Sequence, residues 1–187
     1  MEPIIIGLGY KKGVGKDTVA ARLVDKHGFN RLSFADPLKE ACKVIFHFTD
    51  AQINGDKKEV VDPRWGKTPR QIMQQMGTEA IRNVIDKDVW IKSLKIKIDN
   101  LIRSNPYQQI KIAISDVRFE NEAKAVLAMK GGHLWKVHRD QEANQFSTHE
   151  SEIALDDYTD WTSIINNNSS MAELYRRVDI NLDAIKN

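Results

Sequence analysis

Residues 10–18 carry the residue types that hold phosphate groups in proteins. They read YKKGVGKDT, with an apolar run before them and a helical pattern of apolar residues after them. Gly13 and Gly15 allow a tight turn, so several backbone N–H groups can point at phosphate oxygens. Lys16 adds a full positive charge where a helix N-terminus adds a partial one, which together predicts a phosphate-binding loop. The expected cofactor-binding residues are Lys12, Gly13, Val14, Gly15, Lys16, Asp17 and Thr18.

The loop departs from the usual spacing, G-x-x-x-x-G-K-[ST], at its first position. Tyr10 stands where the first glycine is expected, and Gly9 lies one residue too far from Gly15. Gly13 offers a second flexible hinge inside the loop, which could compensate. The sequence therefore predicts a phosphate cradle but does not give its geometry over residues 10–14.

Asp17 is the second departure, because Ser or Thr usually follows the lysine. Here the hydroxyl comes one place later, at Thr18. A carboxylate beside a triphosphate is repulsive unless a cation lies between them, so Asp17 indicates a nearby magnesium ion. The alternative is an acidic residue in the first turn of an ordinary helix, where its charge suits the helix dipole.

Further charged residues follow two later apolar segments. Asp116 and Arg118 come after an alternation of isoleucines at 110, 112 and 114. An Asp at the end of a strand near a phosphate loop is a usual magnesium position, and Arg118 could reach the phosphates. Arg139 follows another apolar segment and begins a polar stretch without periodicity, residues 139–152. A polar stretch with a basic residue is typical of a lid that covers phosphates.

Two more segments offer residues for a second ligand. Asp36 and Lys39 come just after an apolar stretch, although Asp36 could instead be the N-cap of a helix that contains Pro37. Thr68 and Pro69 open another helix, on which Arg70 and Gln74 share a face. Gln75 and Arg82 of this helix are also expected to point away from the core. An arginine and an amide on one face could hold a phosphate and a base edge, and the alternative is an exposed polar face.

These residues need a scaffold in which strands and helices alternate. Short apolar runs predict strands at residues 3–9, 30–34, 109–115, 133–138 and 161–165. Helical spacing predicts helices at residues 17–26, from 38, 68, 88 and 123 onward, and at 170–178. Residues 49–67 are polar, with two glycines and a proline, and predict a long solvated loop. The alternation predicts an α/β fold, with five parallel strands and helices on both faces of the sheet.

Length and composition limit the function classes. The 187 residues suit one domain, and 28 basic against 26 acidic residues leave a net charge of +2. That balance does not support a nucleic-acid-binding surface. Cys42 is the only cysteine, and no apolar run has the length of a membrane span. We therefore expect a cytoplasmic protein, in the host cytoplasm if viral, without nucleic-acid or membrane partners.

Several segments resemble the deoxynucleoside monophosphate kinases of tailed bacteriophages, in the order that these proteins share. They are residues 15–18 (GKDT), 34–39 (FADPLK), 116–122 (DVRFENE), 149–152 (HESE) and 165–167 (INN). The resemblance implies a P-loop kinase fold over residues 1–187, with a helical substrate-binding insertion at about 36–104 and a lid at about 139–152. It implies transfer of the terminal phosphate of ATP to a deoxynucleoside monophosphate, with Mg²⁺.

The resemblance, together with the reasoning above, assigns roles to individual residues. The catalytic residues are Lys16, Arg118 and Arg139. The metal ligands are Asp17, Thr18 and Asp116, directly or through water. The acceptor nucleotide is assigned to Asp36, Lys39, Arg70, Gln74 and Gln75, and the ATP base to Asn166 and Asn167.

Two other functions stay open at this point. One is a P-loop kinase of another small molecule, such as dephospho-coenzyme A or phosphomevalonate. The other is a nucleotide-binding protein without activity, which the joint presence of Lys16, Asp116 and Arg139 argues against. The sequence is compatible with a homodimer, but it does not give the oligomeric state, the accepted bases or the choice between deoxyribose and ribose.

Overall fold

The computed structural model describes residues 1–140 and 150–186. Its elements are β1 (Ile4–Gly9), α1 (Lys16–His27), β2 (Asn30–Leu32), α2 (Asp36–Phe46), α3 (Asp50–Ile53), the 3-10 helix η1 (Asp56–Glu59), α4 (Pro69–Gln74), the π-helix η2 (Gln75–Arg82), α5 (Val89–Ser104), β3 (Lys111–Val117), α6 (Glu120–Ala128), β4 (Gly132–His138), α7 (Glu150–Ile153), β5 (Ser163–Asn166) and α8 (Met171–Lys186). The strands form one five-stranded sheet in the order β2-β3-β1-β4-β5, and every pair is parallel. The predicted α/β fold is confirmed.

The chain divides into two compact units. The first unit is Met1–Ser33 with Ile98–Asn187, and it contains the whole sheet with α1, α6, α7 and α8. The second unit, Phe34–Lys97, contains α2, α3, η1, α4 and η2. It overlaps the helical insertion predicted at about residues 36–104, whose substrate-binding role stays a prediction.

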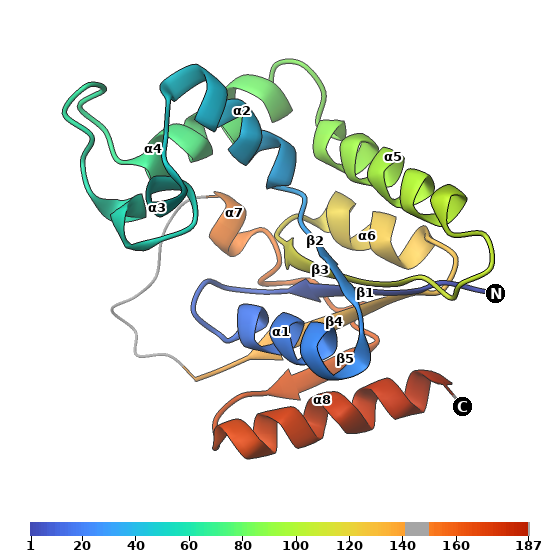
Figure 1. Ribbon diagram of the computed structural model, residues 1–187. Coiled ribbons are helices and arrows are strands. Elements are labelled where there is room, and N and C mark those ends of the chain that lie inside the picture. The colour runs from blue at the N-terminus through green and yellow to red at the C-terminus, as the bar shows by residue number, and fades with distance from the viewer. Residues whose placement is uncertain (141–149, 187) are drawn as a thin grey trace. The chain divides into compact units, whose positions relative to one another are not determined.

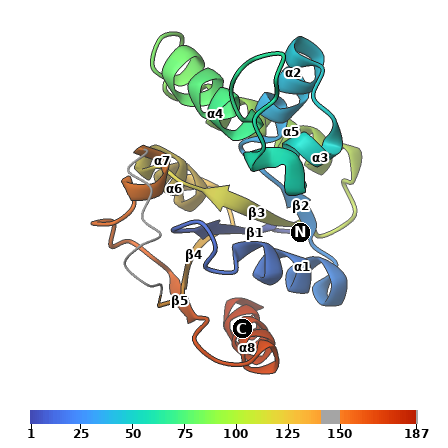
Figure 2. The ribbon, with the colours of Figure 1, turned by 90° about the vertical axis from the view of Figure 1, so that its left-hand side faces the viewer.

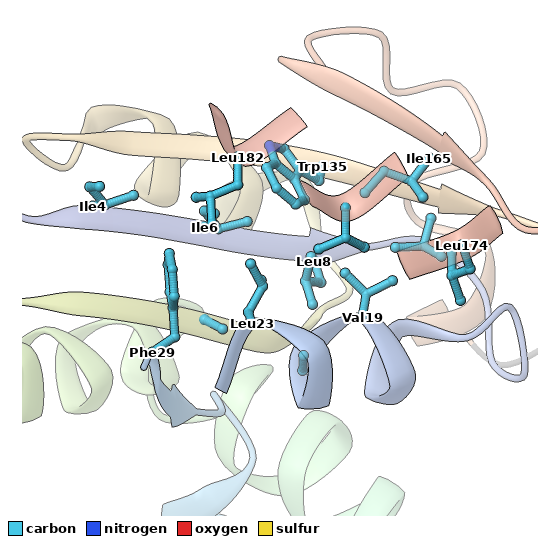
Figure 3. Close-up of a cluster of buried hydrophobic side chains, with 14 of the residues drawn as sticks. Ile4, Ile6, Leu8, Val19, Leu23, Phe29, Trp135, Ile165, Leu174 and Leu182 are labelled. Carbon is cyan, nitrogen blue, oxygen red and sulfur yellow. The ribbon is translucent and has the colours of Figure 1, made fainter. Parts of the chain in front are cut away.

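In the first unit, α1 and α8 lie on one face of the sheet and α6 lies on the other (Figures 1 and 2). The central strand β1 is buried at every position because it has a neighbour on each side and helices on both faces. Side chains of β1, α1, β4 and α8 meet in one hydrophobic cluster (Figure 3). Trp135 and Leu182 of this cluster are fully buried, and a fully buried aliphatic side chain such as Leu182 contributes about 1.5–3 kcal/mol.

Two helix boundaries were predicted correctly from capping residues. Gly28 ends α1 in a left-handed conformation and donates its N–H to Leu23 O and Val24 O. Thr68 caps α4, with Pro69 in the first turn and a reciprocal bond to the Gln71 side chain. These local signals work because the capping residue satisfies backbone groups that the helix itself leaves unpaired.

Four predictions about local structure were wrong. Residues 49–67 do not form a plain loop, because α3 and η1 lie within them. The last helix, α8, continues to Lys186 rather than ending near residue 178. The N-cap of α2 is Ala35, so Asp36 lies in the first turn instead. The polar stretch 139–152 ends in a helix, α7.

None of the helices in the described part of the chain is long and apolar enough to cross a membrane.

Candidate active site

Residues predicted for phosphate and metal binding lie at one edge of the sheet. The loop of residues 10–15 follows β1, Arg118 follows β3, and Arg139 follows β4. Because these strands are parallel, their carboxyl ends share the edge at which open α/β sheets bind ligands. The sheet topology thus brings together residues that are more than a hundred positions apart in the sequence.

The loop backbone replaces the missing glycine by a tyrosine in a conformation typical of glycine. Tyr10 has φ 98°, and Gly13 and Gly15 have φ 79° and 102°. A non-glycine residue in such a conformation costs about 1–3 kcal/mol. The Lys136 ammonium lies 4.1 Å from the centroid of the Tyr10 ring, a contact that helps to hold it. Backbone strain at this position fits a site whose geometry serves a ligand.

Asn167 braces the second half of the loop. Its Nδ2 donates to Val14 O at 2.9 Å, and its own N–H donates to His138 O at 2.7 Å. A Cβ atom added to Gly15 would lie 2.4 Å from Nδ2 of Asn167, so any other residue would displace this amide from the loop and would be strained at φ 102°. Asn166, the last residue of β5, is exposed. The role of both asparagines at the ATP base stays a prediction.

Lys16 is buried beneath the loop, with 7% of its surface exposed. Its Nζ donates to Tyr10 O at 2.8 Å and also to Lys11 O. Burial lowers the pKa of Lys16 to about 7, with a further contribution from the Arg118 guanidinium. A buried ammonium beside a second cation is a site that an anion would stabilise.

Asp17 and Asp116 both act on Lys16 electrostatically and raise its pKa, so the predicted metal ligands lie around the lysine. Asp17 is exposed and pairs with Arg31, while Asp116 Oδ2 accepts a hydrogen bond from Ser33 Oγ at 2.7 Å. Thr18 is half-buried in the first turn of α1. Within residues 1–140 and 150–186, no three His, Cys, Asp or Glu side chains form a metal cluster. Carboxylate and hydroxyl oxygens together with phosphate oxygens are, however, a donor set that suits magnesium.

Glu152 of α7 is a residue of the site that received no role from the sequence. Its Oε2 accepts the backbone N–H of Lys12 at 2.9 Å, and its Oε1 pairs with Nη1 of Arg118 at 2.8 Å. Only 10% of the side chain is exposed. The available signal was the HESE segment at residues 149–152, which the resemblance singled out without a role.

Arg139 is exposed at the end of β4, and no hydrogen bond among the described residues places it at the loop. Most of the predicted lid, residues 141–149, lies outside the described residues. Both assignments stay predictions.

The residues predicted for the acceptor lie in the second unit. Asp36 lies 3.5 Å from Lys97, and Arg70 pairs with Glu59. Gln75 accepts a hydrogen bond from Lys67 at 2.6 Å. Lys39 and Gln74 are half-buried.

The second unit also contains a pocket of about 610 Å³. Its lining residues are Phe46, Trp65, Lys67, Ile72, Gln75, Met76, Glu79 and Ala80. The rings of Phe46 and Trp65 meet edge to face at 5.2 Å. Arg82, expected on the exposed face of the same helix, is instead buried, with 8% of its surface exposed. Of the predicted acceptor residues, only Gln75 lines the pocket.

Comparison with known sequences gives two matches. Residues 48–178 match the model of a family described as deoxynucleotide monophosphate kinase. A protein of Acanthamoeba polyphaga mimivirus, named as a putative deoxynucleotide monophosphate kinase, is 38% identical over an alignment of 185 residues, and 94% of each chain is covered.

Comparison with solved structures bears on the fold. TT1252 from Thermus thermophilus is 17% identical with a TM-score of 0.50, and 98% of each chain is covered. A sugar kinase from Janibacter is 14% identical with a TM-score of 0.50, over 99% of this chain and 98% of that one. At these identities the likeness concerns the fold alone.

Proposed function

The chain belongs to the deoxynucleotide monophosphate kinase family, and we propose on that premise that it transfers the terminal phosphate of ATP to a deoxynucleoside monophosphate. The products are ADP and a deoxynucleoside diphosphate. A phosphotransferase that acts on nucleotides follows from the family, whereas the donor and the acceptor are our proposal. One observation carries it: a buried lysine with a lowered pKa beneath a glycine-rich loop at the carboxyl end of a central parallel strand.

The loop, Lys16 and two arginines serve the transferred phosphate. Phosphoryl transfer requires little covalent chemistry from the protein, so positioning and charge neutralisation account for most of the rate. In our proposal the backbone N–H groups of residues 12–16 and the Lys16 ammonium hold the phosphates of ATP. Arg118 and Arg139 neutralise the charge that develops on the transferred group. A bound phosphate also restores the full charge of Lys16, whose pKa burial has lowered.

The residues around Lys16 also fit a magnesium ion. Thr18, Asp17 and Asp116 would hold it, directly or through water, together with phosphate oxygens. Bound there, the ion neutralises phosphate charge and orients the terminal phosphate. Ser33, which donates a hydrogen bond to Asp116, keeps that carboxylate in place.

We assign the acceptor nucleotide to residues of the second unit. Asp36, Lys39, Arg70, Gln74 and Gln75 are the candidates from the sequence. The pocket beside Gln75 supports a base-binding role, because its aromatic and apolar lining suits a planar ring and Lys67 and Glu79 supply hydrogen-bonding groups. Arg70 would hold the acceptor phosphate once its bond to Glu59 is released.

A panel of acceptors tests the proposal. The purified chain is mixed with ATP and Mg²⁺ and with each deoxy- and ribonucleoside monophosphate in turn, and ADP formation is followed. We expect turnover with one or more deoxynucleoside monophosphates. Dephospho-coenzyme A and phosphomevalonate belong in the same panel, and turnover with either of them alone would replace our proposal by that activity.

A further inference from the structure

The carboxylate of Glu152 binds the same donor groups that the proposed function assigns to the binding of a phosphate. Glu152 binds a backbone N–H of the loop through one oxygen and the Arg118 guanidinium through the other, at 2.9 and 2.8 Å. A backbone N–H and a guanidinium together are donors that a phosphate group uses.

The position of Glu152 is secured by the segment that carries it. Asp156 pairs with Lys11 of the loop at 2.9 Å, so a second carboxylate of this segment contacts the loop. Leu155, between the two acids, is 4% exposed and anchors the segment in the core. The Glu152 carboxylate is thus presented to the loop from a backbone that is anchored on its C-terminal side.

We propose that Glu152 is a positioning residue that occupies part of the phosphate site in the nucleotide-free chain and that a phosphate of ATP displaces its carboxylate. This inference rests on the proposed function, because it takes the loop as the site of a nucleotide phosphate. The carboxylate keeps the loop amide and Arg118 oriented toward one point while no nucleotide is bound. ATP must therefore break two charge-assisted bonds before it forms its own.

The consequence is a measurable cost in ATP affinity. Two charge-assisted bonds must be exchanged, so removal of the competing charge should tighten ATP binding by about tenfold. The substitution Glu152→Gln keeps the size of the side chain but removes the charge that pairs with Arg118, which makes it the informative variant. Glu150→Gln is the matched control, since Glu150 lies in the same helix, carries the same charge and is exposed.

The experiment is calorimetric titration of Mg-ATP into the wild-type chain, Glu152→Gln and Glu150→Gln. We expect Kd to fall about tenfold in Glu152→Gln and to change less than about twofold in Glu150→Gln. An unchanged or weaker affinity in Glu152→Gln, with wild-type binding intact, overturns the inference and leaves the proposed function standing. Equal tightening in the control also overturns it, because a general charge effect then explains the result. Absence of ATP binding by all three proteins overturns the proposed function and the inference together.

A second readout comes from the wild-type chain and does not depend on folding of a variant. Hydrogen exchange of the Lys12 amide and the NMR signal of the Arg118 side chain report on the two bonds to Glu152. We expect the amide to be protected without nucleotide, and the Arg118 signal to shift when ATP replaces the carboxylate. Fast exchange of the Lys12 amide in the free chain, or an Arg118 signal that ATP leaves unchanged, contradicts the inference.

Discussion

Replacement of Lys16 by methionine tests the buried ammonium through stability as well as activity. The pKa of Lys16 is lowered from its usual 10.5 to about 7, chiefly by burial. At about 1.4 kcal/mol per pH unit, this difference disfavours the charged form in the folded chain by about 4–5 kcal/mol near pH 7. The bonds to Tyr10 O and Lys11 O offset part of this cost, by about 1 kcal/mol each. Lys16→Met should therefore raise the free energy of unfolding by about 2–3 kcal/mol at pH 7 while it lowers transfer by about a thousandfold or more.

The pH dependence of this stabilisation has a definite sign. Because the pKa of Lys16 is lower in the folded chain, the unfolded chain binds more protons between about pH 7 and 10.5, and the stability of the wild type rises with pH in that window. The amount by which the free energy of unfolding of Lys16→Met exceeds that of the wild type should decrease by about 2 kcal/mol between about pH 7 and pH 9. Urea unfolding of both proteins at the two pH values measures it. If the variant is less stable than the wild type at pH 7, or if the difference in their free energies of unfolding does not change with pH, the claim that Lys16 is a desolvated ammonium is refuted.

Three further predictions concern other residues of the site. Asp17→Asn should weaken the apparent Mg²⁺ affinity and lower turnover, and a magnesium titration that matches the wild type would leave Asp17 as a helix-terminal residue only. Arg139→Ala should lower the rate of single-turnover transfer by about a hundredfold with little change in nucleotide binding. Arg139→Lys should restore only part of that rate. Normal transfer by Arg139→Ala would show that Arg139 is not the catalytic cation and would leave that role to Arg118. Tyr10→Gly should be more stable than Tyr10→Ala by about 1 kcal/mol, since φ is 98° at this residue, and the reverse order in thermal unfolding would contradict the strained loop.

The sheet and its phosphate loop were predictable because their signals are local. Continuous apolar runs identify buried parallel strands, and the lysine and glycines of the loop must be adjacent in sequence to act together. Thr68 and Gly28 identified helix ends for the same reason, since capping bonds span only a few residues. In contrast, α3 and η1 have four residues each, too few to show a helical period.

Contacts between distant residues were not predictable from the sequence. Glu152 reaches Lys12 across 140 positions, and Asn167 reaches Val14 across 153. In neither pair does the local sequence around one residue identify the other. The two residues of each pair come together only because the parallel order of the strands places their segments at the same edge of the sheet. The sequence places Tyr10 where a glycine is expected, but it does not give the glycine-like conformation that the tyrosine adopts there.

The central claim, transfer of a phosphate from ATP to a deoxynucleoside monophosphate by the loop around Lys16, is tested most directly with ATP labelled in its terminal phosphate. The wild-type chain and Lys16→Met are incubated with this ATP, Mg²⁺ and the acceptor that gives the highest turnover, and the products are separated. We predict that the label appears as the β-phosphate of a deoxynucleoside diphosphate with the wild type and does not with the variant. Label that appears only as inorganic phosphate, or transfer at the same rate by folded Lys16→Met, would contradict the claim.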